Sequence, residues 1–194
     1  MPSSPLTVYI DDSQRDGYQN INSGYYPDEI NVLCNSTSSG AADLNCGYFY
    51  FDLRDATTGL VGSDTITGVK LRVYVQYAAD IGGMGSMGLD ICTNGAWGTV
   101  MTSAPLAGGE TTSFEFVGTL PGVGWLEIDV DPAHITRTTN YTAFRFTPYA
   151  DTWPFYVDFV ASEDSVNTTL HPQCVLTYTS ASGTHQLASL GVGT

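Results

Sequence analysis

The stretch ITGVKLRVYVQYA, which spans Ile66–Ala78, alternates between apolar and polar side chains. The apolar side chains that point to one side are those of Val69, Leu71, Val73 and Val75. The side chains that point to the other side are those of Lys70, Arg72, Tyr74 and Gln76. An alternation with a period of two is typical of a strand with one buried and one solvent-facing side. The stretch therefore predicts a half-buried β-strand.

Short runs with high strand propensity continue along most of the chain. They are TVYI, YFYFDL, GLDIC, SFEFV, WLEIDVD, AFRFTP, FYVDFVA and CVLTYT. Turn-forming residues fill the gaps between them. Only Asp131–Thr138 predicts a short helical turn, with Asp131 as the N-cap and Pro132 at the first position. About nine short strands with almost no helix predict an all-β fold, an antiparallel sandwich of the jelly-roll type.

Length and charge limit the classes of protein that the chain can belong to. The 194 residues suffice for one domain, and we expect residues 1–179 to form a single sandwich. The formal net charge of −14 argues against a nucleic-acid partner, because an anionic surface repels phosphate. No apolar run approaches the length of about 18 residues that a membrane span requires. The stretch MPSSPLTVYIDD has neither the basic nor the apolar region of a signal peptide.

The stretch GGMGSMG, Gly82–Gly88, contains the letters of a dinucleotide-binding fingerprint. That fingerprint works because its last glycine opens a helix whose N-terminus holds the pyrophosphate. Here LDICTNG follows, which predicts another strand and a turn. We therefore interpret the glycines as a loop between two strands.

Four cysteines occur, and none of them has the C-x-x-C spacing of a zinc site. Cys34 and Cys46 flank a loop rich in Ser, Gly and Ala, and they are candidates for a local disulfide. Cys92 and Cys174 lie in strand-like runs, where buried thiols are expected.

The acidic stretch DDSQRDGYQNINSG, Asp11–Gly24, is a candidate calcium site. The proposed oxygen ligands are those of Asp11, Asp12, Asp16 and Asn20, with Asp158 or Glu163 completing the site. Oxygen ligands on a loop suit Ca²⁺, although the spacing is not that of an EF-hand. The alternative is a network of Asx turns that holds no metal.

Loop aromatics are the candidates for a contact surface, because aromatic faces stack on sugar rings and also anchor protein interfaces. The selected residues are Trp97, Tyr149, Trp153 and Tyr156. In a sandwich, the alternative role of such residues is to close the ends of the core.

Three segments, in this order, resemble the DNRLRE-type domain. They are Tyr48–Val75, Gly124–Ile135 and Val157–Thr179, which carry the patterns F-D-L with L-R-x-Y-V, I-D-V, and H-P-x-x-x-L-T-Y. That family is a jelly-roll sandwich similar to carbohydrate-binding modules on secreted bacterial and archaeal proteins. The resemblance implies the fold more than the function.

No sequence motif of a catalytic site is present, so we expect a protein that is not an enzyme. The first hypothesis is a virion surface protein, such as a capsid-decoration or cement protein. Such a protein is made in the host cytoplasm. It would form a homo-oligomer and contact the protein subunits of a capsid or another surface lattice. Its C-terminal extension, residues 180–194, would dock on a partner chain. The alternative is a secreted or cell-surface carbohydrate-binding module, with Ca²⁺ as the one cofactor to consider.

Overall fold

The computed structural model describes residues 5–10, 15–20, 24–27, 29, 31–36, 44–80, 86–92, 110–116, 122–138, 141–149 and 155–180. This part of the chain forms twelve β-strands and three short helical turns. All of the strand pairs are antiparallel. The prediction of an all-β protein with almost no helix is confirmed.

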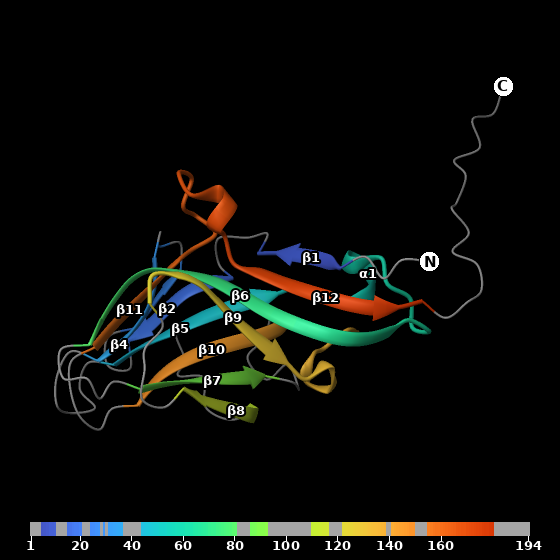
Figure 1. Ribbon diagram of the computed structural model, residues 1–194, viewed down its shortest axis with the longest axis horizontal. Coiled ribbons are helices and arrows are strands. Elements are labelled where there is room, and N and C mark those ends of the chain that lie inside the picture. The colour runs from blue at the N-terminus through green and yellow to red at the C-terminus, as the bar shows by residue number, and fades with distance from the viewer. Residues whose placement is uncertain are drawn as a thin grey trace.

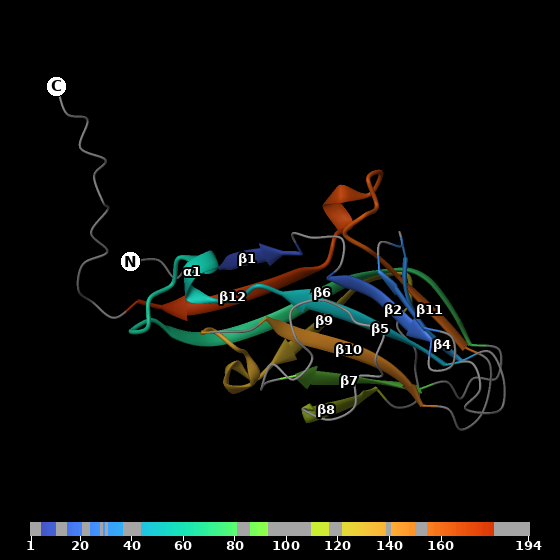
Figure 2. The same ribbon diagram turned by 180° about the vertical axis from the view of Figure 1, so that it is seen from behind.

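Eight of the strands form two facing layers with the strand order of a jelly roll (Figures 1 and 2). The first layer pairs in the order β4-β11-β6-β9, with bounds Asn31–Ser36, Phe155–Val160, Thr65–Asp80 and Gly124–Val130. The second pairs in the order β5-β10-β7-β8, with bounds Leu44–Phe51, Thr142–Tyr149, Ser86–Cys92 and Glu110–Phe116. The predicted sandwich of jelly-roll type is thus confirmed.

Four further strands extend the two layers. In the first layer, β12 (Gln173–Thr179) pairs with β6, and β1 (Leu6–Tyr9) pairs with β12. In the second layer, β2 (Asp16–Asn20) pairs with β5, and β3 (Gly24–Pro27) pairs with β2. The layers meet at one end, where β4 pairs with β5.

The prediction of about nine strands missed three that lie close together in the chain, β2, β3 and β4. Their sequences, DGYQN, GYYP and NVLCNS, are rich in residues that favour turns. They are extended because β2 pairs with β5, β3 pairs with β2, and β4 pairs with β11, so tertiary pairing outweighs local preference.

The core lies between the two layers and consists of the side chains that alternate inward. Val69, Leu71, Val73 and Val75 of β6 are all buried, as their alternation predicts. Phe146 of β10 stacks on Phe159 of β11 across the sandwich, with 4.8 Å between the ring centroids. These contacts fix the distance and rotation between the layers.

Three helical turns connect the strands: α1 (Asp55–Thr58), η2 (Pro132–His134) and η3 (Thr168–Leu170). The predicted turn after β9 is confirmed as η2, where the Asp131 side chain accepts a hydrogen bond of 2.9 Å from the Ala133 amide. No helix in the described ranges is long and apolar enough to cross a membrane.

The nucleotide fingerprint is absent as a structural motif. Gly88, its last glycine, lies inside strand β7 and does not open a helix. Residues 81–85 lie outside the described residues.

The predicted disulfide between Cys34 and Cys46 is wrong, because all four cysteines are free thiols. Both residues lie in strands rather than at the ends of a loop. Cys34 is buried in the main core, whereas Cys46 packs against a separate cluster around Tyr48 and Tyr50. Burial raises the pKa of the Cys34 thiol, and it raises the pKa of Cys46 to about 11. Both thiols are therefore protonated and unreactive near neutral pH.

Candidate functional site

The outward side of the first layer carries aromatic and polar side chains over β6 and its neighbours. We call this surface the β6 face. Its residues on β6 and β9 are Lys70, Arg72, Tyr74, Tyr77, Trp125, Glu127 and Asp129, and its residues on the flanking strands are Gln173 and Asp158. They share one side of the sheet because their inward neighbours form the core.

Trp125 lies at the centre of a fixed group of side chains on this face. It pairs across the strands with Tyr74, and the two rings meet edge to face at a centroid distance of 5.5 Å. The Arg72 guanidinium lies 4.4 Å from the centroid of the indole ring. Trp125 remains partly exposed. Because Arg72 and Tyr74 hold its ring, the indole is oriented before any ligand arrives.

Arg72 is itself held on both sides. Its Nε donates a hydrogen bond of 2.7 Å to Glu127 Oε1, and its Nη1 donates one of 2.7 Å to Gln173 Oε1. Lys70 makes ion pairs of 3.3 Å with both Glu127 and Asp129. Such exposed pairs add little stability, but they fix the guanidinium that lies on the indole.

A β-bulge adds a further aromatic side chain to the β6 face. Asp158 pairs with Tyr77 and Phe159 pairs with Val75, so Gln76 is the extra residue on β6. The Gln76 side-chain amide donates a hydrogen bond to Asn31 Oδ1 of β4, which anchors the bulge. Tyr77 consequently points outward and is 52% exposed. Bulges are frequent where a functional side chain must be re-aimed.

The charges of the β6 face nearly cancel. The face carries two positive side chains, Lys70 and Arg72, and three negative ones, Glu127, Asp129 and Asp158. The whole chain has 6 basic and 20 acidic residues. Burial raises the pKa of Asp158, the carboxyl opposite Tyr77. The β6 face is therefore much closer to neutral than the chain as a whole.

The outward side of the second layer differs, because its aromatic side chains are buried. Tyr48, Tyr50 and Tyr141 are at most 5% exposed. The guanidinium groups of Arg15 and Arg54 lie 4.2 Å and 5.0 Å from the Tyr141 ring centroid. Among the described residues of β5 and β10 and of the turn before β10, these tyrosines form a second small core, whereas Tyr25 of β3 is 37% exposed at the edge of this layer.

Of the predicted contact residues, only Tyr156 has a described side chain. It lies on β11, partly buried, two residues before Asp158 and on the same side of the sheet. Trp97 and Trp153 lie outside the described residues, as does the side chain of Tyr149 on β10. Trp125 and Tyr77 were missed. The alternation of Leu126, Ile128 and Val130 was a signal that could have placed Trp125 outward.

Asp16, a predicted calcium ligand, is fully buried and faces another carboxyl group. Its carboxylate accepts hydrogen bonds of 2.7 Å from the Ser162 amide and 2.8 Å from Ser162 Oγ. Ser162 Oγ also lies 2.8 Å from Glu163 Oε1. One hydroxyl has a single proton to donate, so Ser162 Oγ donates to Asp16 Oδ1 or to Glu163 Oε1, but not to both at once. Burial, and then the nearby charge of Glu163, raise the pKa of Asp16.

The described residues do not form the predicted calcium site. Asp16 and Asn20 lie at opposite ends of β2, about 13 Å apart along the strand, and not together on a turn. The Asn20 side chain donates instead to Asn45 Oδ1 at 3.1 Å. Within the described part of the chain, no three His, Cys, Asp or Glu residues are grouped as metal ligands. Asp11 and Asp12 lie outside that part.

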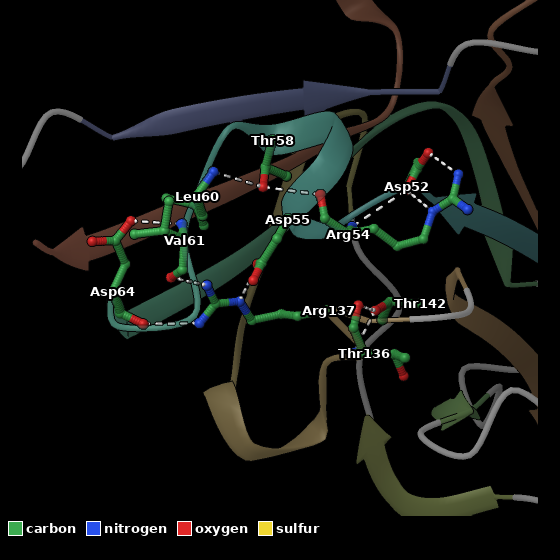
Figure 3. A network of polar contacts seen from close by, with 10 residues as sticks. All are labelled: Asp52, Arg54, Asp55, Thr58, Leu60, Val61, Asp64, Thr136, Arg137 and Thr142. Carbon is green, nitrogen blue, oxygen red and sulfur yellow. Dashed lines mark hydrogen bonds and ion pairs between the residues drawn. The ribbon is translucent and has the colours of Figure 1, made fainter. Parts of the chain in front are cut away.

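A network around Arg137 fixes the connection that leads from β5 into β6 (Figure 3). Its Nε donates a hydrogen bond of 2.7 Å to Asp55 Oδ1. Its Nη1 and Nη2 donate to the backbone oxygens of Asp64 at 2.9 Å and of Val61 at 3.0 Å. The network is structural, and it sets the start of the strand that carries the β6 face.

No protein-family model matches the chain, and no curated protein matches it. The resemblance to the DNRLRE-type domain therefore stays a prediction that rests on the three quoted segments.

Proposed function

We propose that the protein is a non-enzymatic binding module whose ligand is a glycan and whose contact surface is the β6 face. The observation that carries this proposal is the partly exposed Trp125, held in a fixed orientation by Arg72 and Tyr74. An oriented aromatic ring offers an apolar surface to a sugar ring at little cost in conformational entropy. The amide, carboxylate and guanidinium groups around it match the hydroxyl groups of a sugar.

A protein partner is the competing ligand for such a surface, because Trp, Tyr and Arg also dominate protein interfaces. The centre of such an interface is usually depleted of Lys, Glu and Asp, whereas the β6 face carries Lys70, Glu127 and Asp129 beside its aromatic rings. Its neighbours on β12 are Gln173, Val175 and Thr177, which are mostly polar. The chemistry of the face favours a hydroxylated ligand over an apolar protein surface.

A glycan array that covers neutral and anionic polysaccharides tests the proposal. We expect the wild-type protein to be retained, and we expect Trp125→Ala to weaken binding at least about tenfold. The matched control is Tyr25→Ala, since Tyr25 is an exposed aromatic residue on β3 of the other layer. Failure to bind any glycan, or equal binding by Trp125→Ala and the wild type, would contradict the proposal.

The hypothesis of a virion surface protein stays a second prediction. It depended on a C-terminal extension that docks on a partner, and residues 181–194 lie outside the described residues. Light scattering of the chain with and without these residues tests it. A defined oligomer that requires the extension would favour an assembly subunit, whereas a monomer in both cases would contradict that hypothesis.

A further inference from the structure

We infer that the glycan is an uncharged polysaccharide whose chain runs along β6, from Trp125 and Tyr74 at one end to Tyr77 and Asp158 at the other. This inference rests on the proposed function and adds a direction, a second contact and a charge preference to it. Three features of the β6 face support it.

The first feature is the bulge at Gln76. In a regular strand, Tyr77 would continue the inward series that ends at Val75. The extra residue turns Tyr77 to the same side as Tyr74, and the pairing of Tyr77 with Asp158 fixes it there. The bulge interrupts the ladder of hydrogen bonds between β6 and β11, and it leaves the Tyr77 side chain 52% exposed. Packing does not require this arrangement, because an exposed tyrosine adds little to the core.

The second feature is the distance between the two aromatic positions. Tyr77 follows Tyr74 by three residues, which corresponds to about 10 Å along a strand. Trp125 lies directly across from Tyr74 on β9. A single sugar ring is too small to touch both Trp125 and Tyr77, so both contacts form only with a chain of several rings. Val123, which precedes β9 and is 65% exposed, adds apolar surface near this end of β9.

The third feature is charge. Both cationic groups of the β6 face are already paired, Arg72 with Glu127 and Lys70 with Glu127 and Asp129. Asp158 adds a carboxyl beside Tyr77. A carboxylated or sulfated chain would meet these acidic groups without an unpaired cation to bind it on this face. A neutral chain meets no such penalty, and its hydroxyl groups donate to the carboxylates.

The experiment uses titration calorimetry with the full chain. The probes are the neutral polysaccharide that binds best on the array, its oligosaccharides of increasing length, and its carboxymethyl derivative. We expect the affinity of the wild type to rise with oligosaccharide length. We expect Tyr77→Ala to bind the shortest oligosaccharide as the wild type does, but to lose most of the gain with length. Tyr25→Ala is the matched control and should follow the wild type.

The carboxymethyl derivative should bind the wild type at least about tenfold more weakly than the parent polymer does, and Asp158→Asn should reduce that difference. Equal length dependence in Tyr77→Ala and the wild type, or equal affinity for the two polymers, would overturn the inference. If Trp125→Ala alone abolishes binding while Tyr77→Ala changes nothing, the inference fails and the proposed function stands. If no polysaccharide binds, both fail.

Discussion

Asp16 shows how a single carboxyl group couples the stability of this fold to pH. Its folded pKa is raised by burial and by Glu163, whereas the pKa of Asp52 is lowered to about 2 by hydrogen bonds from Arg54. A raised pKa means that the folded state binds a proton at a pH where the unfolded state does not. Asp16 therefore destabilises the fold at neutral pH and ceases to do so as the pH falls toward 4. Asp52 acts in the opposite sense, because its stabilising contribution is lost below about pH 4.

We predict that the melting temperature rises as the pH falls from neutral toward the ordinary range of an aspartate, and that it falls again below about pH 4. Asp16→Asn should remove part of the rise, because the amide keeps the contacts with Ser162 without a charge. Calorimetry measures the melting temperature of the wild type and of Asp16→Asn at each pH across this range. The difference between the two proteins isolates the effect of Asp16, because the other charged groups are common to both. Equal rises in the two proteins would contradict this account of Asp16. A fall in melting temperature on adding a chelator would point to a bound cation instead.

Gly47 provides a second prediction at the residue scale. A Cβ atom at this position would lie 2.8 Å from Val32 Cγ1 and 3.3 Å from the Leu33 carbonyl oxygen. Val32 is fully buried, so it cannot move away freely. Gly47→Ala should therefore lower the free energy of unfolding by about 1–3 kcal/mol. Gly62→Ala is the control, since a Cβ there meets nothing within 4 Å. Chemical denaturation measures both, and equal effects would refute the steric explanation.

At the scale of elements, Arg137 holds the α1 connection to the turn after β9. Its fork-shaped donor set reaches one carboxylate and two backbone oxygens. Arg137→Ala should cost about 2 kcal/mol and should speed hydrogen exchange at Gly59 and Asp64. Arg137→Lys should restore only part of the lost stability, because an ammonium group cannot reach the three acceptors with the geometry of a guanidinium. Lys70→Ala, which breaks only exposed pairs, is the control. Unchanged exchange in Arg137→Ala would contradict the assigned role.

Strands with clear alternation were predictable as elements, and their partners were not. The pattern of β6 gives its inward and outward residues, and that of β9 does the same for Leu126, Ile128 and Val130. Nothing in either pattern states that Tyr74 and Trp125 lie opposite each other. The outward position of Tyr77 also could not be predicted, because the bulge arises from pairing with β11. Asp16 and Asn20 do not lie together on a turn, and Cys34 and Cys46 are free thiols in strands, because the segments of β2, β4 and the start of β5 form strands and not the expected turns and loop.

At the scale of the whole molecule, the jelly roll separates two kinds of aromatic surface. On one outward side, Tyr48, Tyr50 and Tyr141 are buried in a small cluster. The other outward side presents Trp125 and Tyr77 on a nearly neutral patch of a strongly acidic chain. The acidic remainder repels polyanions and other copies of the chain. We expect binding to a neutral glycan to depend only weakly on salt, because no ion pair with the ligand is involved. Titrations at low and high salt measure this, and a strong loss of affinity with salt would indicate an anionic ligand.

The most direct test of the central claim is the NMR signal of the Trp125 indole N–H during titration with a neutral polysaccharide. The chain has three tryptophans, so a Trp125→Phe variant assigns the signal. We predict a saturable shift of the Trp125 signal together with the backbone amides of Tyr74 and Tyr77, and no shift at Tyr25. Saturable binding that leaves the Trp125 signal unchanged, or shifts only the signals of the other two tryptophans, would contradict the claim that the β6 face is the binding surface.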